Sequence, residues 1–293
     1  MSKTKISLIV IAVILLGALI WLFAPPSVGN PPIATDAESI ARGAYAYNAA
    51  GCGSCHDPEK TGAPTGGYDI PQDVTLPVLG HLTGTFYAPN ITPDPETGIG
   101  GWTGRDFLRA IKHGRSPGGS FYWPAFPYRS YKDMTDQDVL DIAAYLMAQP
   151  PVVKENTPHD LPWYQLRLGM SVWMKLAPGM EGTPAPVGDD PLVQRGAYLA
   201  RAMGHCGECH TPRNSLGMTQ YDQEFAGATD IAPNIAEDVV EAYAHDDFIA
   251  LLQIGQKPDF DSVGGEMESV IDHTSKLSAE DQEAYTAFFL RNQ

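Results

Sequence analysis

Every cysteine of the chain lies in one of two short motifs, and a histidine follows each motif directly. The motifs read CGSCH at residues 52–56 and CGECH at residues 206–210. Two thiols at this spacing can pair as a disulfide, hold a zinc ion or form thioether bonds to one porphyrin, and the adjacent imidazole can then bind the iron. A redox pair does not require the histidine, and one zinc site made from both pairs would not need it twice. The motifs therefore predict two covalently bound haems c, attached through Cys52, Cys55, Cys206 and Cys209 and bound at iron by His56 and His210.

The two motifs lie inside an internal repeat. Segments of similar sequence recur in the same order along the chain: RGAY at 42–45 and 195–198, APNI at 88–91 and 232–235, and DF at 106–107 and 247–248. Each copy closes with a helical pattern, at 135–148 and at 278–291. A repeat of this kind predicts two copies of one small domain.

The second axial ligand of each iron separates an electron carrier from a haem that binds small molecules. In the second copy, Met267 follows Gly264 and Gly265 in a loop that can approach a porphyrin closely. We predict Met267 as the sixth ligand there, with a core methionine as the alternative role. The other thioethers near this motif belong to Met203 and Met218.

The first copy lacks an obvious sixth ligand. A constant offset of 141 residues relates the copies downstream of the motifs and places Phe126 opposite Met267. Because a phenyl ring cannot bind iron, we predict the nearest thioether, Met134, as the ligand, although the repeat places it opposite Leu277. The alternatives are Met147, His113 and an iron with one open coordination position.

Helix-start signals precede most of the segments that must hold these residues. Ser or Thr three residues before an acidic side chain begins a helix by capping, and Asp190 before Pro191 is a similar start. The capping pairs are Thr35 with Glu38, Thr103 with Asp106, Thr135 with Asp138, and Ser278 with Asp281. No useful run of alternating strand residues is visible. The pattern predicts an all-α protein.

The chain begins with a hydrophobic segment that predicts a membrane anchor. Residues 6–24 are almost entirely apolar, with Lys3 and Lys5 before them and two prolines after them. Nineteen residues of helix reach about 28 Å, close to the thickness of a bilayer core. A cleaved signal peptide is the alternative. We divide the chain into an anchor (1–26), a first domain (27–149), a Pro-rich connector (150–189) and a second domain (190–293).

The chain is strongly acidic, with 19 Lys and Arg against 35 Asp and Glu, for a net charge of −16. This excess excludes a nucleic-acid-binding role, which needs basic side chains against phosphates. Residues 181–293 hold 6 basic and 20 acidic side chains, whereas residues 27–180 hold 11 and 15. The second domain is therefore predicted to meet a basic partner, with solubility alone as the alternative role of its charge.

Longer motifs carry a family resemblance that covers most of residues 35–293. The chain resembles the cytochrome c subunits of membrane-associated bacterial dehydrogenases, which act on alcohol, gluconate, sorbitol, fructose or aldehyde. The motifs are FYAPNITPD at 86–94, TGIGGW at 97–102, YWPAFPY at 122–128, MTD at 134–136, CGECHTPRN at 206–214 and GEMESV at 265–270.

The resemblance implies two tandem class I cytochrome c-like domains after a transmembrane helix, on the periplasmic side of a bacterial inner membrane. It implies transfer of electrons from a catalytic dehydrogenase subunit, or a quinol-linked donor, to ubiquinone or an oxidase of the respiratory chain. The acidic second domain adds a basic cytochrome, or a basic patch on an oxidase or dehydrogenase, as the predicted partner. Many such subunits carry three haem motifs, and many have Met where this chain has Phe126. A dihaem enzyme, such as a peroxidase or a thiosulfate-oxidising type, is the alternative function.

Overall fold

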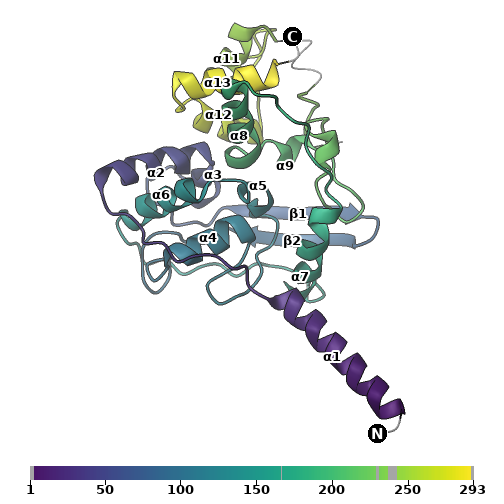
Figure 1. The fold of residues 1–293 in the computed structure, drawn as a ribbon. Helices are drawn as coiled ribbons and strands as arrows, with labels where there is room; N and C mark the ends of the chain where they lie inside the picture. Colours follow the sequence, from purple (N-terminus) through teal and green to yellow (C-terminus); the bar gives the residue numbers. More distant parts are fainter. Residues whose placement is uncertain (1–2, 166, 229–230, 237–242, 292–293) are drawn as a thin grey trace.

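The computed structural model describes residues 3–165, 167–228, 231–236 and 243–291. A long N-terminal helix, α1 (Lys3–Phe23), projects from a body built of two helical units, and the segment that joins the units carries α7 (Arg167–Leu176) (Figure 1). The first unit contains α2 (Ala37–Ala49), α3 (Cys52–His56), α4 (Gly104–His113), α5 (Tyr128–Tyr131) and α6 (Asp136–Met147). The second unit contains α8 (Pro191–Tyr198), α9 (Gly207–His210), α11 (His245–Ile254), α12 (Glu266–Thr274) and α13 (Ala279–Phe289).

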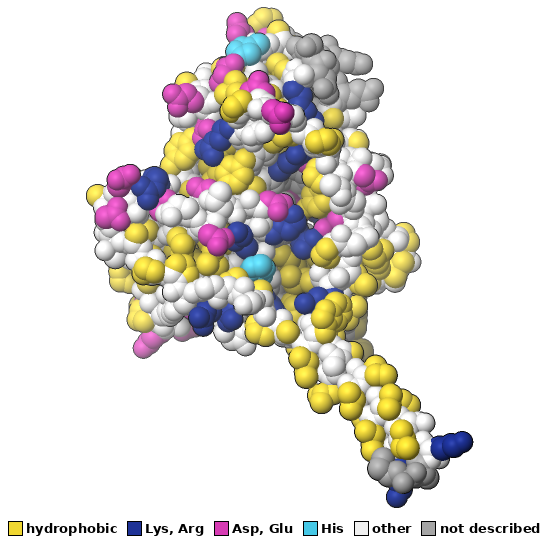
Figure 2. Space-filling view, viewed as in Figure 1, with side chains coloured by type: hydrophobic (Ala, Val, Ile, Leu, Met, Phe, Trp, Pro, Cys, Tyr) yellow, Lys and Arg dark blue, Asp and Glu magenta, His cyan; other side chains and the backbone are white. Residues whose placement is uncertain are grey.

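Helix α1 has the length and the composition of a membrane-spanning segment. It is 21 residues long, none of its residues is buried, and hydrophobic side chains cover its surface (Figure 2). A helix of this length covers about 30 Å, which matches the hydrocarbon core of a bilayer. The predicted anchor therefore has a helical structure that suits it.

The end of α1 is joined to the first unit by a buried arginine. The guanidinium of Arg115 donates hydrogen bonds to the carbonyl oxygens of Phe23 at 2.8 Å and Ala24 at 3.3 Å. It also lies 3.6 Å from the centre of the Phe121 ring. The last carbonyls of a helix lack partners within the helix, and a cation there is favoured by the helix dipole. Arg115 thus fixes the point where α1 meets the body.

Four of the five predicted helix starts are confirmed. Thr103, Thr135 and Ser278 accept hydrogen bonds from the N–H three residues later, and Asp190 caps α8 with Pro191 in the first helical position. The prediction for Thr35 is wrong by one residue. Asp36 caps α2 instead, because its carboxylate accepts from both the N–H and the hydroxyl of Ser39.

Each unit is organised by one close crossing of two helices, α2 on α6 and α8 on α13. Gly43 of α2 lies so close to α6 that a Cβ there would be 1.8 Å from the carbonyl oxygen of Asp141. Gly196 of α8 has the same relation to Ala284, also at 1.8 Å. The glycine of the repeated RGAY segment is therefore the contact point of both crossings.

The prediction of an all-α protein is wrong in one place, where β1 (Asp69–Leu76) and β2 (Gly80–Tyr87) form an antiparallel hairpin. Asp160 pairs with Thr85 on the open side of β2. Most side chains of β1 are exposed, so the strand carries no clear apolar alternation. Pro71 is tolerated because β1 is an edge strand. Backbone hydrogen bonds, rather than a buried face, define this hairpin.

Equivalent residues of the two units exchange the same contacts across their interface. The Tyr45 hydroxyl of α2 donates to the Asp281 carboxylate at 2.5 Å and accepts from the N–H of the N-cap residue of α13 at 3.2 Å. Tyr198 of α8 likewise donates to Asp138 and accepts from the N-cap N–H of α6 at 3.0 Å. Such reciprocal contacts are those of an isologous interface. The units dock within one chain as two copies do in a symmetric dimer.

Candidate haem sites

The two predicted proximal histidines have the same hydrogen bond. Nδ1 of His56 lies 2.8 Å from the carbonyl oxygen of Pro89, and Nδ1 of His210 lies 2.8 Å from that of Pro233. A carbonyl oxygen only accepts, so each Nδ1 carries the proton and Nε2 keeps its lone pair. Burial lowers the pKa of both imidazoles, so they are neutral at pH 7. Each histidine is therefore in the form that binds iron.

A glycine in each unit lets the loop after the motif approach this carbonyl segment. Gly66 donates its N–H to the carbonyl of His56 at 2.8 Å, and Gly227 does the same for His210 at 2.8 Å. Both have positive φ angles, of 69° and 82°. A Cβ on Gly66 would lie 2.4 Å from the Pro89 carbonyl oxygen, so the close approach excludes larger residues.

The four cysteine side chains are free thiols. Burial raises the pKa of Cys52 and of Cys206 to about 12, and that of Cys55 to about 11. A zinc site or a reactive redox pair needs thiolates, and these environments favour the thiol form. Among the described residues, no group of three or more His, Cys, Asp or Glu side chains forms a metal cluster. In these surroundings the cysteines are neutral thiols, and their attachment to haem stays a prediction.

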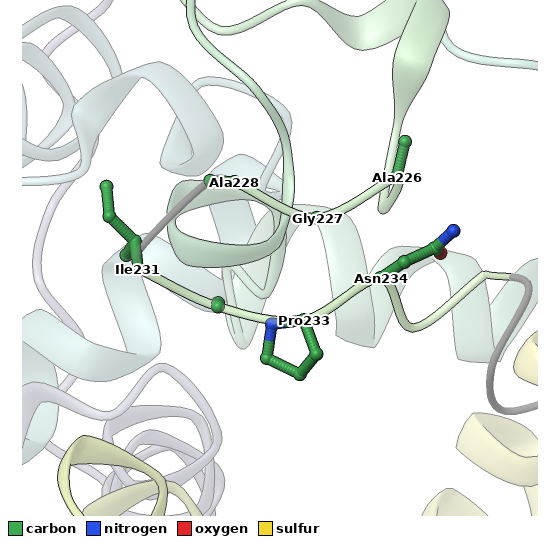
Figure 3. Close-up of a pocket in the computed structure, with 7 residues that line it drawn as sticks. Ala226, Gly227, Ala228, Ile231, Pro233 and Asn234 are labelled. Atoms are coloured by element: carbon green, nitrogen blue, oxygen red, sulfur yellow. The ribbon is translucent and has the colours of Figure 1, made fainter.

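The loop that holds His210 also borders a cavity of about 480 Å³, open to solvent (Figure 3). Residues 226–228 and 231–234 line it. In Figure 3, the segment with Ala226 and Gly227 lies opposite the segment with Pro233 and Asn234. None of these lining residues is titratable. The described part of its lining therefore offers shape, but no acid, base or nucleophile.

The middle of each motif contacts the other unit. The Ser54 hydroxyl, in the first motif, lies 2.6 Å from Nε2 of His273 and 2.7 Å from the Ser269 hydroxyl, both on α12. Glu208 occupies the same position in the second motif and accepts a hydrogen bond from Ser130 of α5 at 2.8 Å. Both motifs therefore lie at the interface between the units.

The residues that precede the two motifs are direct neighbours. A Cβ on Gly51 would lie 3.7 Å from Nε2 of His205. Tyr131 packs its ring against that of His205, with centroids 5.5 Å apart, and donates its hydroxyl to the carbonyl of Ala50 at 2.6 Å. The residues that directly precede the two attachment motifs thus meet at the interface.

The predicted sixth ligands have different surroundings. Met267 lies in the first turn of α12, half-buried, directly after Gly265 and Glu266. Met134 is 2% exposed in the core of the first unit, and Met203 and Met218 are also fully buried. The assignments of Met267 and Met134 to iron stay predictions.

Buried polar atoms without partners provide a further test of whether haem fits. Among the described residues, Arg109 Nε and the Tyr128 hydroxyl in the first unit have no hydrogen-bond partner, and neither has the Tyr221 hydroxyl in the second. Leaving such a group unpaired costs about 1–3 kcal/mol. All three are donors, and haem carries propionate acceptors, so their chemistry fits a porphyrin in each unit. A fourth such atom, Gln72 Oε1 in β1, is an acceptor and has no partner of this kind in haem.

Several functional residues belong to segments that recur in both units, but the sequence alone assigned them no role. Pro89 and Pro233 belong to the repeated APNI segment, and Tyr45 and Tyr198 belong to the repeated RGAY segment. Their roles, orienting the histidines and docking the units, depend on contacts between segments far apart in the chain.

Comparison with known proteins agrees with this geometry. The cytochrome c family model matches residues 40–150. The chain is 38% identical over 287 residues to a diheme cytochrome c-type protein of Cereibacter sphaeroides, an alignment that covers 93% of this chain and 92% of that protein.

Cytochrome subunits of dehydrogenases are also similar. The gluconate 2-dehydrogenase cytochrome c subunit of Pantoea cypripedii is 32% identical over 86% of this chain, and the fructose dehydrogenase cytochrome subunit of Gluconobacter japonicus is 34% identical over 83%. The chain spans only 59% and 50% of the lengths of these two subunits. The extent and identity of the first match, together with the family model, establish that the chain belongs to the cytochrome c family.

Proposed function

We propose that the chain is a dihaem electron carrier with one haem c in each unit. The observation that carries this proposal is the reciprocal interface, in which the middle residue of each attachment motif is hydrogen-bonded to the opposite unit. Electrons entering at one unit then have a short route to the other within a single chain. The direction is from a dehydrogenase, or a quinol-linked donor, to a respiratory-chain acceptor.

The protein's own residues attach, orient and shield the two groups. Cys52 and Cys55 attach the first haem, and Cys206 and Cys209 attach the second. The Pro89 and Pro233 carbonyls hold the proximal imidazoles as neutral ligands. When bound, haem c supplies an iron that cycles between two oxidation states, and a Met ligand such as Met267 raises its potential.

We infer that α1 is a single inner-membrane span with the two units on the periplasmic side. Its length of 21 residues and its almost entirely apolar sequence from Ile6 onward support the span, and Lys3 and Lys5 in its first turn support a cytoplasmic N-terminus. The domains are then residues 27–149 and 190–293, with 150–189 as the connector.

The partner that supplies electrons is proposed to be a catalytic dehydrogenase subunit. The support is the similarity to cytochrome subunits named for gluconate and fructose dehydrogenases. Affinity purification of the full chain from detergent-solubilised membranes should recover such a subunit. Its substrate should then reduce the haems of the purified complex.

Removing either haem is expected to interrupt electron flow. Substituting Cys52 and Cys55 together, or Cys206 and Cys209 together, with alanine should halve the covalently bound haem and abolish most substrate-dependent reduction of the acceptor. A pyridine haemochrome assay and stopped-flow spectroscopy measure the two effects. His81→Gln, at an exposed position of the hairpin, is the control. It should keep the full haem content and the full rate of acceptor reduction.

Two outcomes would contradict this function. Full electron flow after loss of one haem would show that the units do not act in series. Rapid peroxide turnover by the complete protein would favour the dihaem enzyme.

The acceptor is proposed to be a basic protein that meets the second unit. Residues 181–293 carry 20 acidic and 6 basic side chains. The rate of electron transfer to a basic cytochrome c is expected to fall by about tenfold or more from low to high ionic strength, since salt screens the attraction. Stopped-flow measurements across a salt series check this. A neutral dye as acceptor is the control, and a salt-independent rate with the cytochrome would contradict the proposal.

A further inference from the structure

The two units have the same backbone register after helices α4 and α11. Gly114 and Gly255 end these helices, and both have positive φ angles. The N–H of Tyr122 donates to the Gly114 carbonyl at 2.8 Å, and the N–H of Val263 donates to the Gly255 carbonyl at 2.9 Å. The offset of 141 residues is therefore a structural equivalence up to Tyr122 and Val263.

A second register holds from α5 and α12 onward. The N–H of Lys132 donates to Tyr128 at 3.0 Å, and the N–H of Ser275 donates to Ile271 at 2.9 Å. These pairs differ by 143 residues. Downstream of α4 and α11, the two units therefore differ in length only between the registers, at residues 123–127 in the first unit and 264–270 in the second.

The shorter segment contains no side chain that can bind iron. Residues 264–270 carry Met267, whereas residues 123–127 read Trp-Pro-Ala-Phe-Pro. Wherever the two-residue difference falls within this segment, the first unit has no counterpart of Met267 there.

The other candidate ligands of the first unit occupy packing positions. Met134 is equivalent to Leu277, because each donates its N–H to the residue three before it and directly precedes a helix cap. Both side chains are buried, at 2% and 7% exposed. By the same registers Met147 corresponds to Leu290, and His113 corresponds to Ile254. In the second unit, none of these positions can supply a ligand.

Phe126 lies instead in a group of aromatic rings. Its ring centroid is 5.9 Å from that of Tyr122, 6.4 Å from Tyr128 and 5.7 Å from Tyr131. Burial raises the pKa of Tyr122 to about 12 and also raises that of Tyr128, so both are neutral phenols in these surroundings. Tyr128 is 1% exposed, and its hydroxyl has no hydrogen-bond partner among the described residues.

We propose that the first unit leaves one coordination position of its haem open, and that this position binds a neutral diatomic ligand such as CO or NO. The aromatic rings around Phe126 suit an apolar diatomic. This inference rests on the proposed presence of one haem in each unit.

Titration of the reduced, full-length protein with CO in detergent tests the proposal. We expect one equivalent of CO per chain, with half of the haem changing its spectrum. Phe126→Met should abolish this binding by supplying a thioether. Phe126→Leu, which supplies no ligand, should retain one equivalent, and Met267→Leu should raise binding to two.

The outcomes separate this inference from the proposed function. A protein with fewer than two haems would contradict the function itself. A protein with two haems that binds no CO would leave the function standing and overturn the inference. If CO bound only after Met134→Leu, Met134 would be the sixth ligand and the position would be closed. If Phe126→Met did not fold, the stoichiometries of the unchanged protein, Phe126→Leu and Met267→Leu would still decide.

Discussion

Replacing Gly43 or Gly196 by alanine is expected to destabilise the unit that carries it by more than about 3 kcal/mol, beyond the usual cost of overpacking. A Cβ at either position would lie 1.8 Å from a backbone carbonyl oxygen of the crossing helix. No rotamer change relieves a contact between Cβ and backbone, so the helices must separate. The loss then includes the apolar packing of α2 on α6, or of α8 on α13.

Guanidinium unfolding of the haem-loaded protein, followed at the haem absorbance and by circular dichroism, measures this effect. Gly169→Ala in α7 is the matched control, because nothing lies within 4 Å of a Cβ there. That change should be neutral or stabilising by up to about 1 kcal/mol. Equal free energies of unfolding for Gly196→Ala and Gly169→Ala would contradict the prediction that a Cβ at the helix crossing is destabilising.

Asp281→Asn is expected to lower the free energy of unfolding by about 2–3 kcal/mol at pH 7. The carboxylate accepts hydrogen bonds from Arg195 Nε at 2.8 Å and Nη2 at 2.7 Å. It also accepts from the Tyr45 hydroxyl of the other unit at 2.5 Å. An amide can satisfy only some of these donors and leaves the arginine charge without its partner. One change therefore weakens both a helix pair and the interface.

The same carboxylate gives a defined pH dependence. Burial raises the pKa of Asp281, but the hydrogen bonds from Arg195 and Tyr45 outweigh burial, so the pKa lies below its ordinary value of 3.8. Because the folded protein holds the proton less tightly, the stabilisation is complete above that value and is lost as the pH falls through the folded pKa.

The difference in the free energy of unfolding between the wild type and Asp281→Asn should therefore be smaller at pH 3 than at pH 7. Glu280→Gln, at an exposed position one residue earlier, should have little effect at either pH. A gap that widened in acid would contradict the assigned hydrogen bonds.

The sequence predicted the local features of this fold well, and the features that depend on docking poorly. Thr103, Thr135, Asp190 and Ser278 cap helices as their own side chains dictate. The hairpin was missed because β1 is mostly exposed, β2 shows no alternation of buried and exposed residues, and Pro71 and Gly84 interrupt the strands. Strand β1 is defined by its hydrogen bonds to β2. The sequence pattern of a single strand does not reveal such bonds.

The candidate site divides in the same way. The CxxCH spacing carries its chemistry in five consecutive residues, so it is readable without the fold. The partner of each imidazole is 33 residues away at Pro89 and 23 residues away at Pro233. The partner of Tyr45, at Asp281, is 236 residues away in the other unit. Repetition of APNI and RGAY marked these residues, but only the docked structure assigns them a role.

The arginine joint at the end of α1 restricts the orientation of the body relative to the helix. Arg115 holds the last carbonyls of the helix to the first unit, and Lys175 of α7 lies 5.1 Å from the centre of the Trp21 ring. If α1 spans a bilayer, such a joint restricts rotation of the two units relative to the helix, which a flexible linker would not do. The haem units then travel with the helix at a set height and tilt. Encounters become collisions in the plane of the membrane, governed by lateral diffusion and by which face is turned toward the partner.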